Sequence, residues 1–218
     1  LEQFWADDAF GKSVSAKGEI LLEGFKAIQD KYADHVIAWT EIMKKELVDY
    51  HDVPRDAIHV AGIAHYDHYA DPSFVIPEHD LRRTMNIPEN DKIIMFGVGM
   101  PAMFHELNLE VIHFLGKSAR EGLFAENCSI IVRPHPNYWM ITKAQSQNIQ
   151  LAEALEAACR EYDSIILNRP SIKGDVKPGI PYDLAEDDQK ILASLIKYST
   201  CVVSEFSTLI LEASIFNT

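Results

Sequence analysis

The feature that most constrains the fold is an alternation of short β-branched runs with longer helical patterns over residues 92–217. The β-branched runs are 92–99, 128–133, 164–170 and 200–204, and the helical patterns are 107–121, 148–162, 187–199 and 209–217. Parallel strands need a crossover connection, and this is usually a helix. The alternation therefore predicts an α/β fold with a Rossmann-like parallel sheet and flanking helices.

A smaller strand–helix–strand pattern precedes this region. Strand patterns at 35–40 and 57–62 flank a helical pattern that begins after Thr40, whose hydroxyl can accept a hydrogen bond from a first-turn N–H. Residues 17–32 show a further helical pattern, and residues 63–80 form the expected linker because they hold prolines and little periodicity. We expect two parts, residues 1–74 and residues 75–218.

Composition excludes some classes of partner. A net charge of −13 argues against a general nucleic-acid or anionic-membrane surface, which needs dense lysine and arginine. A small phosphate site is still allowed. No apolar run is long enough for a membrane span and no signal-peptide pattern is visible, so we expect a cytoplasmic protein. The chain begins at Leu1 and stops directly after a helical pattern, and we interpret it as a fragment.

Two glycines end the first strand pattern of the second part, in the stretch Gly97-Val-Gly-Met-Pro. Ligands of open parallel sheets bind beyond the carboxyl ends of the strands, and Gly97 and Gly99 would let the backbone approach a ligand closely. The pattern is neither GxGxxG nor a Walker loop. A tight strand-to-helix turn explains both glycines equally well.

The strand pattern at 128–133 ends in Arg-Pro-His-Pro-Asn. Arg133 and His135 each precede a proline, which holds both residues extended and predicts their side chains on the same side of the chain. Arginine offers a planar fork for phosphate oxygens, and histidine offers one or two N–H donors. We therefore predict an anion site, most simply for phosphate; the alternative is a capping interaction with backbone carbonyls.

The last strand pattern turns into a helix through Ser204-Glu-Phe-Ser-Thr. Helix N-termini present unpaired N–H groups, so the turn at Ser207 and Thr208 predicts a second anion site. Glu212 follows one helical turn later, where a carboxylate could accept hydrogen bonds from two sugar hydroxyls. An ordinary capped helix with a solvated glutamate is the alternative.

The sequence predicts no metal site and no nucleophile. His65, Asp67 and His68 fall in the linker and lack a strong ligand pattern. The stretch that begins at His105 is not HExxH, because Leu109 stands where the second histidine is needed. No serine lies in a GxSxG elbow.

In combination these segments resemble the GT-B superfamily, which includes nucleotide-sugar glycosyltransferases, CDP-glycerol glycerophosphotransferases, capsule polysaccharide transferases and non-hydrolysing UDP-N-acetylglucosamine epimerases. Residues 38–69 look like the end of the first domain, and residues 93–101 like the first strand of the nucleotide-binding domain. Residues 130–137 are similar to the Arg/Lys-x-His-Pro segment of the glycerophosphotransferase and capsule-transferase branches. Residues 195–213 resemble the diphosphate and ribose segment.

The resemblance implies a role for each of these residues. Ser207 and Thr208 would hold the diphosphate of a nucleotide-activated donor, and Glu212 would bind its ribose. Arg133 and His135 would be catalytic, stabilising the charge that develops as the nucleotide leaves. Gly97 and Gly99 would allow close approach of the donor.

The implied function is transfer of a sugar or polyol phosphate from a UDP- or CDP-linked donor to a cell-surface glycan or lipid-linked acceptor. The enzyme would work in the cytoplasm, with peripheral association at the inner face of the membrane allowed, and it would bind no tight cofactor. Residues 1–74 would be the C-terminal part of the acceptor-side domain, and residues 75–218 a donor-binding domain truncated at its C-terminus. The alternatives are a nucleotide-sugar epimerase and a non-catalytic nucleotide-binding or assembly domain.

Overall fold

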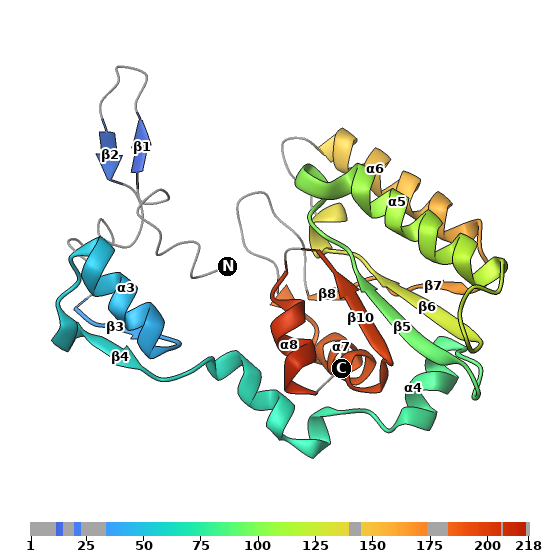
Figure 1. Cartoon of the computed structure of the whole chain (residues 1–218), viewed down its shortest axis with the longest axis horizontal. Coiled ribbons are helices and arrows are strands. Elements are labelled where there is room, and N and C mark those ends of the chain that lie inside the picture. The colour runs from blue at the N-terminus through green and yellow to red at the C-terminus, as the bar shows by residue number, and fades with distance from the viewer. Residues whose placement is uncertain are drawn as a thin grey trace. The chain divides into compact units, whose positions relative to one another are not determined.

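The structure, a computed structural model, describes residues 12–14, 20–22, 34–139, 145–173, 183–205 and 207–216 (Figure 1). The chain divides into two compact units, Leu1–His68 and Tyr69–Thr218. The assignment of the two parts to an acceptor side and a donor side stays a prediction.

The first unit contains the predicted parallel strand–helix–strand arrangement. β3 (Val36–Ala38) and β4 (Ile58–Val60) pair in parallel, and α3 (Glu41–His51) and the short 3-10 helix η1 (Arg55–Ala57) connect them. Thr40 caps α3, because its Oγ1 accepts a hydrogen bond from the Met43 N–H at 3.1 Å. Apolar side chains of these elements form one small core, made of Val36, Ala38, Met43, Leu47, Val53 and Ile58.

An antiparallel pair, β1 (Lys12–Val14) and β2 (Ile20–Leu22), also belongs to this unit. The helix predicted over residues 17–32 is wrong at Ile20–Leu22, which form a strand. The other residues of that prediction lie outside the described residues. The prediction failed at these residues because a short apolar run fits helical and strand periodicity alike.

The second unit is built on a four-stranded sheet. Its strands are β5 (Lys92–Gly97), β6 (Cys128–Arg133), β7 (Ile165–Leu167) and β10 (Cys201–Ser204), in the order β10-β5-β6-β7. All three pairings are parallel, which confirms the predicted sheet. β5 comes first in the sequence and pairs with β6 on one side and with β10 on the other. The strand order therefore reverses between β5 and β10. This is the arrangement of a Rossmann-like half.

Helices cover both faces of this sheet (Figure 1). α5 (Pro101–Arg120) and α6 (Gln145–Arg160) pack on one face, where the core includes Phe96, Ile130 and Val132. Side chains alternate between faces along a strand, so Ile131 of β6 belongs instead to the core on the other face. β6 is therefore buried on both faces, which is typical of parallel sheets.

Three helices supply the second face: α4 (Glu78–Met85), α7 (Glu186–Tyr198) and α8 (Leu209–Ile215). They contribute Leu81, Leu195 and Leu209 to the core that contains Ile131. The helix predicted from residue 107 begins earlier, at Pro101, since proline suits the first position of a helix.

Shorter elements connect this framework. Three are 3-10 helices: η2 (Ala64–Ala70), η3 (Pro72–Phe74) and η4 (Pro136–Tyr138). A small antiparallel pair, β8 (Ile172–Lys173) with β9 (Asp183–Leu184), was not predicted, because two-residue strands carry no periodicity.

Candidate functional site

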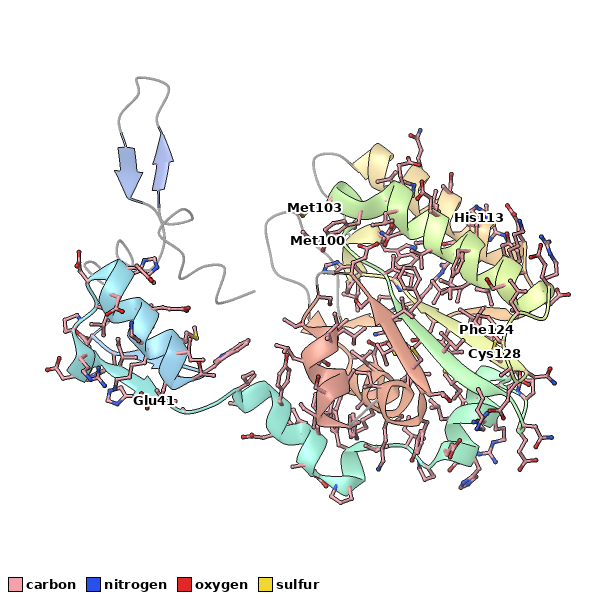
Figure 2. All side chains as sticks on the ribbon, viewed as in Figure 1. Glu41, Met100, Met103, His113, Phe124 and Cys128 are labelled. Carbon is pink, nitrogen blue, oxygen red and sulfur yellow. The ribbon has the colours of Figure 1, made fainter. Side chains whose placement is uncertain are left out.

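The carboxyl ends of three neighbouring strands lie in register. Ser204 of β10 pairs with Gly97 of β5, and Gly97 pairs with Arg133 of β6. Met100 and Met103, at the start of α5, lie at this end of the sheet, whereas Phe124 and Cys128 lie at the opposite end (Figure 2). We call this end, formed by residues 97–100, 133–137 and the described residues of 204–208, the carboxyl edge. Strand order reverses here, and such edges are where open α/β sheets bind ligands.

Side chains packed at this edge occupy the space next to both predicted glycines. A Cβ on Gly97 would lie 2.1 Å from Cδ2 of Leu209 at the start of α8. A Cβ on Gly99 would lie 2.2 Å from Oε2 of Glu205 and 2.9 Å from the ring of Phe104. The glycines therefore let the turn after β5 approach the turn after β10, which agrees with the tight-turn interpretation and still leaves ligand contact a prediction.

The guanidinium of Arg133 is buried and already holds protein partners. Its Nη1 donates to Asn168 Oδ1 at 2.6 Å and to Asp188 Oδ1 at 3.0 Å, and its Nη2 donates to Asp188 Oδ2. The backbone N–H of Ser171 donates to Asp188 Oδ1 at 2.9 Å. This cluster ties the end of β6 to the turn after β7 and to the first turn of α7. The carboxylate of Asp188 thus binds the Arg133 guanidinium, for which the sequence predicted an anionic ligand.

His135 lies just beyond Arg133 and caps η4. Its Nδ1 accepts a hydrogen bond from the Asn137 N–H at 3.1 Å. Burial lowers the pKa of its imidazole. Both observations favour the neutral ring with its proton on Nε2, so His135 can offer one N–H donor. The structure gives Arg133 and His135 different partners, and the predicted catalytic role of each stays a prediction.

The turn before α8 holds the next two predicted residues. Ser207 Oγ accepts a hydrogen bond from the Leu209 N–H at 3.2 Å, whereas the Thr208 side chain makes no capping bond. Both residues are partly buried. Their part in holding a diphosphate stays a prediction.

Glu212 is buried in α8, so the alternative of a solvated glutamate is wrong. The hydroxyl of Tyr69 donates a hydrogen bond to its Oε2. The Tyr69 ring in turn packs edge-on against Phe216, with centroids 5.4 Å apart. A linker residue, Tyr69, therefore contacts the carboxylate that the resemblance assigns to ribose.

Sequence reasoning missed a buried polar network behind the turn after β5. The side-chain amide of Asn108, in α5, accepts from the Gly99 N–H and donates to the Gly99 carbonyl, both at 3.2 Å. The same amide donates to the Tyr138 hydroxyl at 3.0 Å, and burial raises the pKa of that phenol to about 12. His105 lies 3.3 Å from this hydroxyl. Asn108 thus fixes the turn, and the sequence signal was a polar residue on an otherwise apolar helix face.

Glu205, directly after β10, is the second residue that sequence reasoning missed. Both of its carboxyl oxygens are covered, and neither has a hydrogen-bond partner within the described part of the chain. Burial raises the pKa of this carboxyl. The local sequence around Glu205 gives no sign of this burial, because a glutamate in a polar turn is usually solvated.

Among the described residues, no group of three or more His, Cys, Asp or Glu side chains could hold a metal ion. In the same residues, no helix is long and apolar enough to cross a membrane.

Comparisons with solved structures identify the fold. UDP-GlcNAc 2-epimerase from Methanocaldococcus jannaschii, in complex with UDP-GlcNAc and UDP, matches 88% of this chain with a TM-score of 0.55 and 14% identity. The epimerases from Neisseria meningitidis, bound to UDP-GlcNAc, and from Rickettsia bellii match 81% and 88% of it, each with a TM-score of 0.53, at 16% and 19% identity. The chain has the GT-B fold.

The GT-B likeness covers only part of those proteins. The chain spans 46%, 40% and 42% of the three epimerases, respectively. No protein-family model matches the sequence, and no curated protein matches it significantly. At these identities the comparison establishes the fold alone, and the carboxyl edge and its site residues rest on their own geometry.

Proposed function

We propose that the second unit binds the nucleotide part of an activated donor at the carboxyl edge, and that the whole protein is a transferase for a sugar or polyol phosphate. The observation that carries this proposal is the register of Ser204, Gly97 and Arg133 at the reversal of strand order. It supports one shared site for three turns that are far apart in the sequence. GT-B neighbours that bind UDP-GlcNAc support a nucleotide-sugar ligand.

In the proposed site, the turn at Ser207 and Thr208 holds the diphosphate, and Glu212 accepts hydrogen bonds from the ribose hydroxyls. Gly97 and Gly99 let the backbone approach the donor. A carboxylate has several lone-pair positions, so Glu212 can bind Tyr69 and a sugar hydroxyl together.

His135 is the proposed catalytic donor: its Nε2–H would stabilise the phosphate charge as the nucleotide leaves. Arg133 acts in this proposal as a positioning residue, because Asp188 and Asn168 already engage its guanidinium. It fixes the turn that presents His135. The proposed acceptor is a glycan or lipid-linked molecule, reached from the cytoplasm at the inner face of a membrane.

Nucleotide binding is tested by titrating UDP, CDP and GDP while thermal unfolding is followed. A ligand that binds only the folded state stabilises it by about 2.7 kcal/mol at one hundred times its dissociation constant. For a protein of this size, each kcal/mol raises the midpoint by about 2–4 °C. If none of the three nucleotides raises the thermal midpoint, the proposed donor site is wrong.

A second candidate function is epimerisation, because the three structural neighbours named above are epimerases. The whole protein is then incubated with UDP-N-acetylglucosamine without acceptor. Appearance of the 2-epimer favours the epimerase, whereas turnover that requires a glycan or polyol acceptor favours the transferase. Nucleotide binding without either reaction would indicate a binding or assembly domain.

A further inference from the structure

The Glu205 carboxyl lies at the reversal of strand order, and among the described residues it has no hydrogen-bond partner. It follows the last residue of β10, and its Oε2 occupies the space that a side chain at Gly99 would need. Neither oxygen is exposed, and neither accepts or donates a hydrogen bond among the described residues. A polar group in that state is destabilising unless a proton or a ligand compensates it.

Among the described residues, the side chains around Gly99 offer this carboxyl no hydrogen-bond partner. Phe104 is apolar, and the amide of Asn108 is fully engaged by Gly99 and Tyr138. The titratable groups that face this region from the other elements are Tyr138, whose pKa the negative charge of Glu205 helps to raise, and His105, which contacts the Tyr138 hydroxyl. No cation among the described residues offsets the effect of burial on Glu205.

Burial of the two oxygens favours the neutral form of this carboxyl in the unliganded protein. A carboxyl group without water or a counter-ion is more stable in its neutral form. The neutral form also changes what the group can bind, because a protonated carboxyl carries an O–H donor. An ionised Glu205 would repel a diphosphate at the neighbouring Ser207 and Thr208, whereas a protonated one can donate to a phosphate oxygen.

We propose that Glu205 is a ligand-contact residue of the donor site: when the donor binds, its side chain turns from Gly99 toward the ligand and, in its protonated form, donates a hydrogen bond to a diphosphate oxygen. This inference rests on the proposed nucleotide site. It adds a proton-dependent contact that the resemblance does not assign. Glu205 then keeps its proton in the complex with the donor, and the affinity of the protein for the donor falls at a pH where Glu205 loses that proton.

The test measures the affinity of UDP-N-acetylglucosamine by titration calorimetry from pH 5 to pH 9, with CDP-glycerol as a second probe. Both probes are diphosphate diesters whose charge is constant in this range, so a pH dependence reports on the protein. Above the pKa of Glu205, the affinity of the unmodified chain is expected to fall about tenfold per pH unit. The amide of Glu205→Gln keeps an N–H donor, so this variant should bind at every pH with little change.

Two further variants isolate the contact. Glu205→Ala removes the donor and should weaken binding about 10- to 100-fold at pH 5. Glu110→Gln makes the same chemical change at an exposed position of α5 and should follow the unmodified chain. Circular dichroism checks that each variant is folded before titration.

The outcomes separate this inference from the proposed function. Binding with the same pH profile in the unmodified chain and in Glu205→Gln, or affinity that rises with pH, overturns the role of Glu205 and leaves the nucleotide site standing. Absence of binding by both probes at every pH overturns the nucleotide site and the Glu205 contact together. A falling profile that Glu205→Gln abolishes supports both.

Discussion

The buried ion pair between Arg133 and Asp188 gives the sharpest test of how the carboxyl edge is held together. The side chains are 6% and 2% exposed, and Asp188 accepts from Arg133 and from the Ser171 N–H. Replacing Asp188 by alanine leaves a guanidinium inside the protein without its counter-charge. Breaking a buried pair in this way typically costs about 3–5 kcal/mol. That is a large part of the roughly 5–15 kcal/mol by which domains are stable.

The assay is urea unfolding followed by circular dichroism and tryptophan fluorescence. Asp188→Ala and Arg133→Met are each expected to lower the unfolding free energy by about 3–5 kcal/mol, or the thermal midpoint by about 6–20 °C. The double variant Arg133→Met/Asp188→Ala replaces the pair by apolar groups. It should lose less than the sum of the single variants by about 1–3 kcal/mol.

A matched control is the surface pair of Lys92 and Glu126, whose side chains are 48% and 63% exposed. Glu126→Gln should change the unfolding free energy by less than about 1 kcal/mol. If the buried single variants cost no more than this control, or if the double variant is additive, the pair does not fix the edge. The positioning role of Arg133 would then be wrong.

Three other changes probe the site. Gly97→Ala places a Cβ 2.1 Å from Leu209 Cδ2 and should destabilise the chain by about 1–3 kcal/mol in urea unfolding; an unchanged midpoint would show that Leu209 has room to move. Tyr69→Phe removes a hydroxyl donor from the buried Glu212, so it should lower stability by about 1–3 kcal/mol and weaken UDP binding, whereas Tyr50→Phe, at an exposed position, should do neither. The lowered pKa of His135 stabilises the fold above the ordinary value of 6.5, and this contribution is lost as the pH falls below it. Unfolding free energies at pH 7.5 and pH 5 should therefore differ less for His135→Gln than for the unmodified chain, and equal differences would contradict the assignment.

The sequence was sufficient for the elements that carry a clear period. The strands β5, β6 and β10 and the cap at Thr40 follow from local chemistry, and the parallel sheet follows from their alternation with helices. The position of β10 beside β5 could not be predicted in the same way, because residues 98–200 separate the two strands.

Side-chain partners were the least predictable part of the site. Arg133 was correctly placed at a strand end, but Asp188 comes from 55 positions away, and Tyr69 reaches Glu212 across 143. Glu205 and Asn108 are ordinary residues in their local sequence. Their burial arises only when the turns after β5 and β10 meet. No local sequence pattern predicts that contact.

The contact between Gly99 and Glu205 also has an evolutionary consequence. The carboxyl group fills the volume that any side chain at position 99 would occupy. The two positions are therefore expected to covary among homologous chains: a larger residue at position 99 should occur only with a smaller one at position 205. A lineage that shortened Glu205 first could then accept alanine or serine at position 99, whereas the reverse order of substitutions would pass through a chain with a steric clash.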